Sequence, residues 1–335
     1  MPQLRRSLII IAYVLGIAVA LTARTAALAD PLPSWNEGAA KTAIVAFVER
    51  VTTEGTPDFV PVSQRIAVFD NDGTLWPEQP VPAQIAFELA CLAAAEPDHP
   101  AWSTTQPFKA ALEKDTSFLA RIGEKGFEQI LVASHAGWTT YDYEMAVTGW
   151  MATTRDARFN RPLTKLVYQP MLELIDYMRS HGFDIYILSG NSADFMRPWV
   201  ANVYGLPPDH VIGSSIRTKF EIVASKPSLT RLPEMSVVGD GAGRPAGIYE
   251  RIGRRPIAVF GNSDGDLEML QWATAGTDAR LGLLVRHTDA EREYRYDRGA
   301  EFGRLDKALD AAAANGWTVV DMKHDWKFVF PFELR

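Results

Sequence analysis

Apolar residues follow two different spacings along the chain. The helical spacing predicts helices at roughly 37–53, 82–95, 106–122, 124–136, 141–153, 169–180 and 266–273. Short apolar runs predict buried strands at Ile66–Phe69, Phe183–Leu188, His210–Gly213, Ile257–Phe260 and Leu281–Val285. Helices that alternate with apolar strands favour a parallel sheet with helices on both faces, and therefore an α/β fold with a Rossmann-like core.

The pattern beyond Arg286 is different. Residues 289–298 are charged on all sides and predict a solvated helix or loop. An amphipathic helix is expected over 304–314 and a further strand over 317–321. The apolar segment Phe328–Phe332 is expected to be buried, or else to face a partner.

The first 29 residues read as an export signal. Arg5 and Arg6 precede the uncharged, mostly apolar run Leu8–Ala23, and Ala27-Leu28-Ala29 has the form of a cleavage site. The expected mature chain begins at Asp30, is exported to the periplasm and keeps no stable membrane span. A single-span anchor is the competing interpretation, and the arginine pair leaves a twin-arginine route open beside the general one.

Composition narrows the function classes. The chain has 335 residues, 47% of them apolar and 22% charged, which is typical of a globular protein. Lys and Arg number 34 against 41 Asp and Glu, with no basic run, so a nucleic-acid partner is not expected. Cys91 is the single cysteine and no His pair has metal-ligand spacing, so neither an internal disulfide nor a zinc site is expected.

The candidate chemistry lies where strands end. Asp70-Asn71-Asp72-Gly73-Thr74 follows the strand Ile66–Phe69 directly. One of the two carboxylates could attack phosphorus while the other exchanges a proton with the leaving group. A polar turn or a fragment of a calcium loop would contain the same residues, so the motif needs its context to be informative.

The residues around this motif resemble those of a known family. Ile66–Trp76 reads IAVFDNDGTLW and resembles the first motif of the haloacid dehalogenase-like (HAD) superfamily of hydrolases. Tyr186–Gly190 resembles the second motif and Gly261–Asp266 the fourth, each after a predicted strand and in the expected order. The likeness around Phe260–Leu270 is to the phosphoserine-phosphatase-like branch.

The resemblance implies a phosphatase that works in two steps. Asp70 would be the nucleophile and Asp72 the general acid and base, with Ser189 at the substrate phosphate. Members that cleave carbon–halogen bonds lack an acid at the position of Asp72. Mg²⁺ is the implied cofactor and a small phosphorylated compound the implied substrate. The implied substrate-binding residues are Thr74, Ser189, Gly190 and Asn191, and the implied metal ligands are Asp70, Asp72 through its backbone carbonyl, Asn262 and Asp266.

Two positions depart from the family pattern. Asn262 stands where the fourth motif usually has its first acid, and Asp264 is a possible substitute ligand. From the sequence alone, Asn262→Asp is expected to tighten metal binding. The third motif is usually a lysine that opens a helix. Here Arg244 is expected to open the helix near Pro245 and to fill that role, with Lys226 and Lys219 as alternatives.

The segment between the first two motifs resembles the helical cap of many relatives. The expected division is a core of residues 30–80 and 160–335 and a cap of residues 81–159, entered through a flap at 76–79. Cation–π binding of a cationic head group is one role open to the aromatic side chains of the cap, and packing is the other. These side chains are Trp102, Trp138, Tyr141, Tyr143 and Trp150.

Three functions share these residues. The expected function is that of an exported, Mg²⁺-dependent phosphomonoesterase that forms an aspartyl phosphate. A phosphomutase or phosphonate hydrolase would use the same scaffold. The departures at Asn262 and Arg244 also allow a catalytically weakened protein that binds a phosphorylated ligand without turning it over.

Overall fold

The computed structural model describes residues 30–236 and 240–334. The predicted export signal over residues 1–29 lies outside the described residues. Leu32–Arg335 form one compact unit, and the fold is that of this unit. Among the described residues, no helix is both long and apolar enough to cross a membrane.

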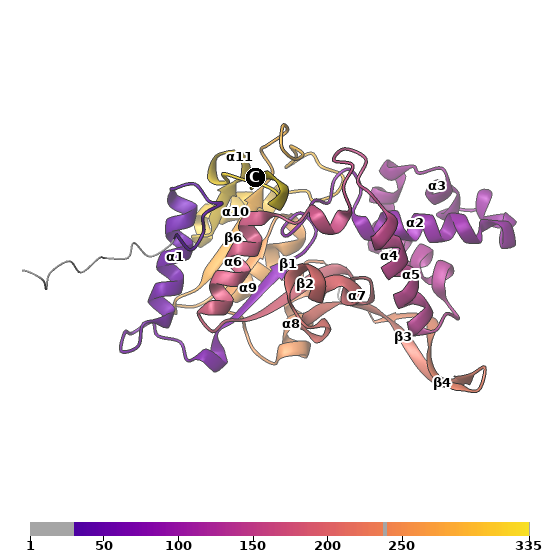
Figure 1. The fold of residues 1–335 in the computed structure, drawn as a ribbon, viewed down its shortest axis with the longest axis horizontal. Helices are drawn as coiled ribbons and strands as arrows, with labels where there is room; N and C mark the ends of the chain where they lie inside the picture. Colours follow the sequence, from indigo (N-terminus) through magenta and orange to yellow (C-terminus); the bar gives the residue numbers. More distant parts are fainter. Residues whose placement is uncertain (1–29, 237–239, 335) are drawn as a thin grey trace, which may run out of the picture. The chain divides into compact units, whose positions relative to one another are not determined.

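A seven-stranded sheet in the order β4-β3-β2-β1-β5-β6-β7 forms the centre of the unit (Figure 1). All neighbouring strands are parallel except β3 and β4, which are antiparallel. The strands are β1 (Ile66–Asp70), β2 (Asp184–Ser192), β3 (Val211–Val223), β4 (Lys226–Ser236), β5 (Ala258–Gly261), β6 (Leu281–Arg286) and β7 (Thr318–Asp321). The predicted α/β fold with a parallel sheet is confirmed.

Helices cover both faces of the sheet. In β1, Ala67 and Phe69 belong to one apolar cluster and Ile66 and Val68 to another, as the alternation of side chains along a strand requires. The first cluster includes side chains of α1 (Ala39–Thr52), α6 (Gln169–Ser180) and α7 (Ala193–Tyr204). The second includes side chains of α8 (Gly243–Ile252), α9 (Leu267–Thr274) and α10 (Lys307–Asn315). A last short helix, α11, spans Met322–Asp325.

The helical insert follows β1, as predicted. Its helices are α2 (Ala83–Ala95), α3 (Phe108–Leu112), α4 (Thr116–His135) and α5 (Thr140–Thr153). Gly123, expected to end a helix, instead lies at a kink inside α4 with a φ of 60°. The insert has a small apolar cluster of its own, formed by Leu92, Ala111, Leu119 and Ile130.

The antiparallel hairpin of β3 and β4 was not predicted. The sequence predicts a strand of four residues over His210–Gly213, whereas β3 continues to Val223 and pairs with β4. Ala224 and Ser225 connect the two strands with φ angles of 49° and 66°. A two-residue hairpin turn with positive φ usually contains Asn or Gly, so these two residues carry no turn signal in the sequence.

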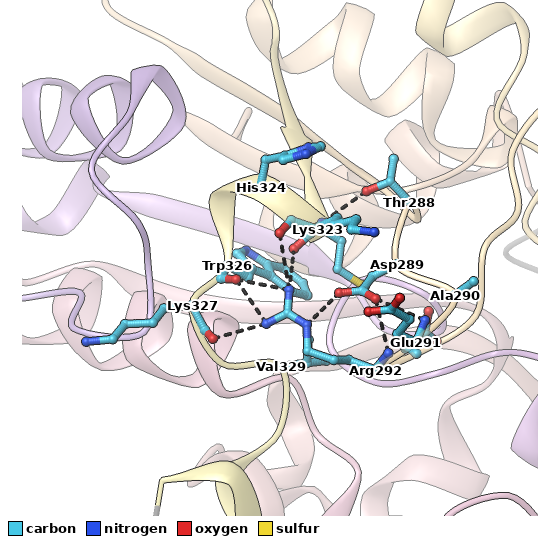
Figure 2. A network of polar contacts seen from close by, with 12 residues as sticks. Thr288, Asp289, Ala290, Glu291, Arg292, Lys323, His324, Trp326, Lys327 and Val329 are labelled. Carbon is cyan, nitrogen blue, oxygen red and sulfur yellow. Dashed lines mark hydrogen bonds and ion pairs between the residues drawn. The ribbon is translucent and has the colours of Figure 1, made fainter.

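The segment 289–298 is also different from its prediction. It is a loop, but Asp289 and Glu293 are buried in it rather than solvated. Figure 2 shows how Arg292 fixes the loop: its guanidinium donates to Asp289 and to backbone carbonyls of the C-terminal segment, including those of Trp326 and Lys327. The Arg292 guanidinium satisfies these acceptors, so the charged segment is held against the core. In the apolar segment Phe328–Phe332, which was expected to be buried, Val329 and Phe330 are fully buried and the other three residues are half-buried.

Candidate active site

The end of β1 places two carboxylates at the centre of the sheet. β1 lies between β2 and β5, with Asp70 in register with Leu188 and Phe69 in register with Phe260. Residues that follow these strands therefore meet at one edge, where open parallel sheets bind ligands. The strand order thus brings the first, second and fourth motifs together.

The turn after Asp70 requires glycine. Gly73 has a φ of 78°, and a Cβ atom there would lie 2.1 Å from Asn262 Nδ2. The same turn holds the second carboxylate, because Trp76 Nε1 and Asn71 Nδ2 both donate to Asp72 Oδ1. His287 Nε2 donates to the Gly73 carbonyl at 2.7 Å and attaches the turn to the end of β6.

Arg244 reaches the first carboxylate from helix α8. Its Nη1 donates to Asp70 Oδ1 at 2.6 Å and to Asp266 Oδ1 at 2.7 Å, and its Nη2 donates to Asp240 at 2.9 Å. Burial lowers the pKa of Arg244, but Asp266, Asp70 and Asp240 outweigh this effect and raise it well above its ordinary value. Arg244 is therefore a fixed positive charge at the site.

The two alternatives to Arg244 lie elsewhere. Lys219 and Lys226 are on the β3–β4 hairpin, where Lys219 pairs with Glu221 at 2.8 Å. Neither lysine lines the cavity above Asp70. Asp264, considered as a substitute ligand, accepts hydrogen bonds from backbone N–H groups at the start of α10 and so has a structural role.

Asn262 and Asp266 face Asp70 from the loop after β5. The Thr74 hydroxyl lies 3.1 Å from both Asp70 Oδ2 and Asn262 Oδ1 and connects the two side chains. Asp266 Oδ2 accepts from the backbone N–H groups of Asn262 and Ser263, which fixes its orientation. Thr74 is fully buried and is not among the residues that line the cavity; its hydroxyl contacts Asp70 and Asn262, and its expected role at the substrate stays a prediction.

Glu78 belongs to the site, although the sequence predicts it only as part of the flap at 76–79. Its Oε1 accepts from Asn262 Nδ2 at 2.7 Å and from the Tyr296 hydroxyl at 2.8 Å. A Cβ atom at Gly303 would lie only 1.8 Å from the same oxygen, so glycine is needed there. Nothing in the sequence connects these residues, because they are far apart along the chain.

The site holds more buried carboxylates than cations. Burial, and then the charge of Asp266, raise the pKa of Asp70 well above its ordinary value; burial also raises the pKa of Glu78 and of Asp266. A divalent cation would offset this charge, and carboxylate and amide oxygens are the donors that Mg²⁺ prefers. The donor set thus fits Mg²⁺, although the described residues contain no ready-made cluster of metal-binding side chains.

The predicted phosphate-binding residues lie at the end of β2. Ser189 is buried and lines the cavity together with Gly190. A Cβ atom at Gly190 would lie 2.5 Å from Asp240 Oδ1, so the backbone approaches that carboxylate closely. Asn191 belongs to β2, but its side chain lies outside the described residues.

A cavity of about 540 Å³ covers these groups. On the side of the sheet and of α8, the cavity is lined by Asp70, Asp72, Ser189 and Arg244. The opposite wall comes from the helical insert and is largely apolar, with Ile85, Leu119, Phe127 and Leu131. None of the five aromatic side chains considered for cation–π binding is among the lining residues. Tyr143 is instead buried under Arg231, whose guanidinium carbon lies 3.7 Å from the centre of its ring.

The parallel sheet, the helical insert after β1 and the acidic residues at the strand ends are features of a HAD-like fold. The chain belongs to the haloacid dehalogenase-like hydrolase family, whose sequence profile matches residues 67–271. That family consists mostly of phosphatases and typically uses Mg²⁺. No curated protein matches the chain significantly.

Solved structures resemble the chain at low identity. A protein of unknown function from Anaerococcus prevotii matches with a TM-score of 0.48 and 14% identity, over 79% of this chain and 93% of that one. A Bordetella pertussis protein of unknown function matches with a TM-score of 0.48 and 13% identity, over 77% and 99%. A probable phosphoserine phosphatase from Vibrio cholerae matches with a TM-score of 0.38 and 13% identity, over 81% and 70%.

Proposed function

We propose that the chain is an exported, Mg²⁺-dependent phosphomonoesterase that acts on a small substrate through an aspartyl phosphate. The observation that supports this most is the placement of Asp70 and Asp72 in one cavity with Ser189 and Arg244. Export rests only on the sequence of residues 1–29 and is tested by finding Asp30 at the N-terminus of the periplasmic protein.

In the first step, the Asp70 carboxylate attacks phosphorus while the bond from phosphorus to the leaving oxygen breaks. Asp72 gives its proton to that oxygen, which departs as an alcohol. In the second step, a water molecule attacks the same phosphorus and gives its proton to Asp72, and the bond between Asp70 and phosphorus breaks to release phosphate. The hydrogen bonds from Trp76 and Asn71 hold the Asp72 carboxylate for both transfers.

Charge stabilisation would come from two sources. Arg244, already in contact with Asp70, can donate to the oxygens of the transferring phosphoryl group. Ser189 can donate to them from β2, the strand next to β1. Asp70, the backbone carbonyl of Asp72, Asn262 and Asp266 would hold Mg²⁺. The ion would supply positive charge toward the developing negative charge at phosphorus.

The experiment is a phosphate-release assay on the purified chain with a panel of phosphomonoesters and one phosphonate, in Mg²⁺ or EDTA. We expect metal-dependent release that Asp70→Asn abolishes, because the amide cannot attack phosphorus, while thermal unfolding stays close to that of the unmodified chain. Retained activity in D70N would remove the nucleophile assignment. Isomerised product without free phosphate would indicate a mutase, and phosphate binding without turnover would indicate the weakened binding protein.

A further inference from the structure

The side chain of Asn262 is held from both sides. Its Oδ1 lies 3.1 Å from the Thr74 hydroxyl, which is equally close to Asp70, and its Nδ2 donates to Glu78 Oε1 at 2.7 Å. An amide in this arrangement points its oxygen toward the nucleophile and its nitrogen toward Glu78. The Glu78 carboxylate therefore fixes which end of the amide faces Asp70.

Glu78 is itself held in place without a cation. Oε1 also accepts from the Tyr296 hydroxyl at 2.8 Å, and the close approach of Gly303 leaves the side chain little freedom. Its side chain is buried at 6% exposure, and no basic side chain in the described part of the chain lies within ion-pair distance of it. An ionised carboxylate is costly to bury in this way unless another positive charge offsets it.

Around Asp70, carboxylates outnumber positively charged side chains. Five carboxylates line or contact this end of the cavity, and Arg244 is the cation that contacts three of them, Asp70, Asp240 and Asp266; the other two are Asp72 and Glu78. Asn262 occupies a position where relatives are expected to carry an acid, which would remove one negative charge from the site. Glu78, in direct contact with Asn262, places a carboxyl group next to the same position, and a bound cation would offset the cost of burying its negative charge.

We infer that Glu78 is the charge partner of Asn262 in the cation site: it aims the Asn262 oxygen at the bound cation and supplies the negative charge that an acid at position 262 would provide. Glu78 is a positioning residue in this role. The inference rests on the cation-dependent function proposed above, and it concerns binding of the cation rather than the chemistry at phosphorus.

The test moves the negative charge from position 78 to position 262 and uses Mn²⁺ as the probe. The Kd for Mn²⁺ is measured by electron paramagnetic resonance on the full chain without substrate, for the unmodified chain, E78Q, N262D and the double variant. Glutamine has nearly the shape of glutamate and can still accept from Asn262 and Tyr296, so E78Q tests the charge. Thermal unfolding of each variant checks the fold.

We expect E78Q to weaken Mn²⁺ binding by about tenfold or more, in the range typical of partners of metal ligands. N262D should then restore the affinity in the E78Q background to within about threefold of the original value, since the negative charge has only moved by one contact. In the presence of Glu78, N262D should change the affinity much less, because the charge is already supplied. This last expectation replaces the tightening expected from the sequence alone.

Two further variants separate charge from position. E144Q removes an exposed carboxylate of α5, far from the proposed cation ligands in sequence, and should leave the Kd for Mn²⁺ nearly unchanged. Y296F removes a hydrogen bond that holds Glu78 but keeps its carboxylate, so it should weaken Mn²⁺ binding less than E78Q does.

Three results would overturn the inference: unchanged Mn²⁺ affinity in E78Q, no restoration in the double variant, or no Mn²⁺ binding by the unmodified chain. The phosphatase proposal is tested independently by phosphate release. An intact exchange pattern in a chain that releases no phosphate would contradict that proposal alone, whereas metal-dependent release with an unaffected E78Q would contradict this one alone.

Discussion

At the scale of the residue, the structure orients the candidate nucleophile through both of its oxygens. Oδ1 of Asp70 accepts from Arg244 and Oδ2 lies 3.1 Å from the Thr74 hydroxyl, so both oxygens of the carboxylate are in contact with a neighbouring side chain before substrate arrives. Such preorganisation lowers the cost of reaching the reactive geometry. The same guanidinium fixes Asp266, which makes Arg244 the common partner of two motifs that are far apart in sequence.

Arg244 provides a prediction at this scale. R244A leaves two buried carboxylates without their cation, and the free energy of unfolding in EDTA should fall by about 3–5 kcal/mol. R244K keeps the charge but cannot contact three carboxylates with one planar fork, so its stability should be intermediate and its phosphatase activity low. Urea denaturation and phosphate release measure the two effects. R251A, on an exposed face of the same helix, is the control, and a stability of R244A equal to that of R251A would refute the prediction.

Part of this site can be predicted from the sequence. The motifs at the ends of β1, β2 and β5 are local, so the positions of Asp70, Ser189 and Asp266 could be predicted from them. The sequence favours Arg244 for the basic role but leaves Lys226 and Lys219 as alternatives, since only the packing of α8 distinguishes Arg244 from the lysines of the hairpin. The contact between Glu78 and Tyr296 depends on a loop that folds back on the flap, and no local signal predicts such a contact.

At the scale of the element, helices α2 and α4 of the insert bring two buried titratable groups, Glu88 and His135, next to each other. His135 Nδ1 donates to the Leu131 carbonyl at 3.1 Å, so its Nε2 carries a lone pair, which lies 3.2 Å from Glu88 Oε2. Two acceptors would face each other there unless Glu88 is protonated. Burial raises the pKa of Glu88 to about 8, and burial followed by the charge of Arg231 lowers the pKa of His135 to about 3.

This pair predicts a loss of stability as the pH rises. Because the pKa of Glu88 is raised on folding, its contribution is complete below the ordinary pKa of 4.5 and is lost as the pH rises through about 8. The free energy of unfolding, measured in urea, should therefore fall between about pH 5 and pH 8 and then level off as far as this group is concerned. E88Q can still donate to His135 and should flatten this dependence. An exposed control, E144Q, should not, and an equal slope in E88Q would contradict the prediction.

The hairpin shows why other elements could not be predicted. β4 has few buried positions, and it is a strand because β3 extends beyond the core and pairs with it along its length. Pairing of this kind gives the backbone N–H and C=O groups their hydrogen-bond partners and does not require an apolar pattern. The buried strands β1, β5 and β6 have that pattern, and their predicted limits differ from the observed ones by no more than one residue at any end.

At the scale of the whole molecule, Arg292 connects the C-terminal segment to the site. Its guanidinium donates to the carbonyls of Trp326 and Lys327 at 3.1 and 3.0 Å (Figure 2). Although burial favours the neutral acid, the hydrogen bonds from Arg292 hold the pKa of Asp289 below its ordinary value. The loop fixed in this way carries Tyr296, the hydroxyl partner of Glu78.

We predict that R292A lowers the free energy of unfolding by about 3 kcal/mol, because a buried carboxylate and several carbonyls lose their donor together. R292K should recover only part of this loss, since an ammonium cannot reach the carbonyls on both sides at once. Urea denaturation measures both variants. A loss in R292A no greater than that in R295A, a neighbour in the same loop, would rule out the role of the network.

The hydrogen bond from His287 to the Gly73 carbonyl has a consequence for how the protein is made. The two residues are 214 positions apart, so a ribosome that adds about 5–20 residues per second needs on the order of 10 to 40 s to supply the second after the first. During that interval the turn carrying Asp72 lacks its support, and the loop that positions Glu78 does not yet exist. The nascent chain would therefore lack this hydrogen bond, and with it the complete arrangement of the candidate site, until the residues from His287 to Gly303 have been synthesised.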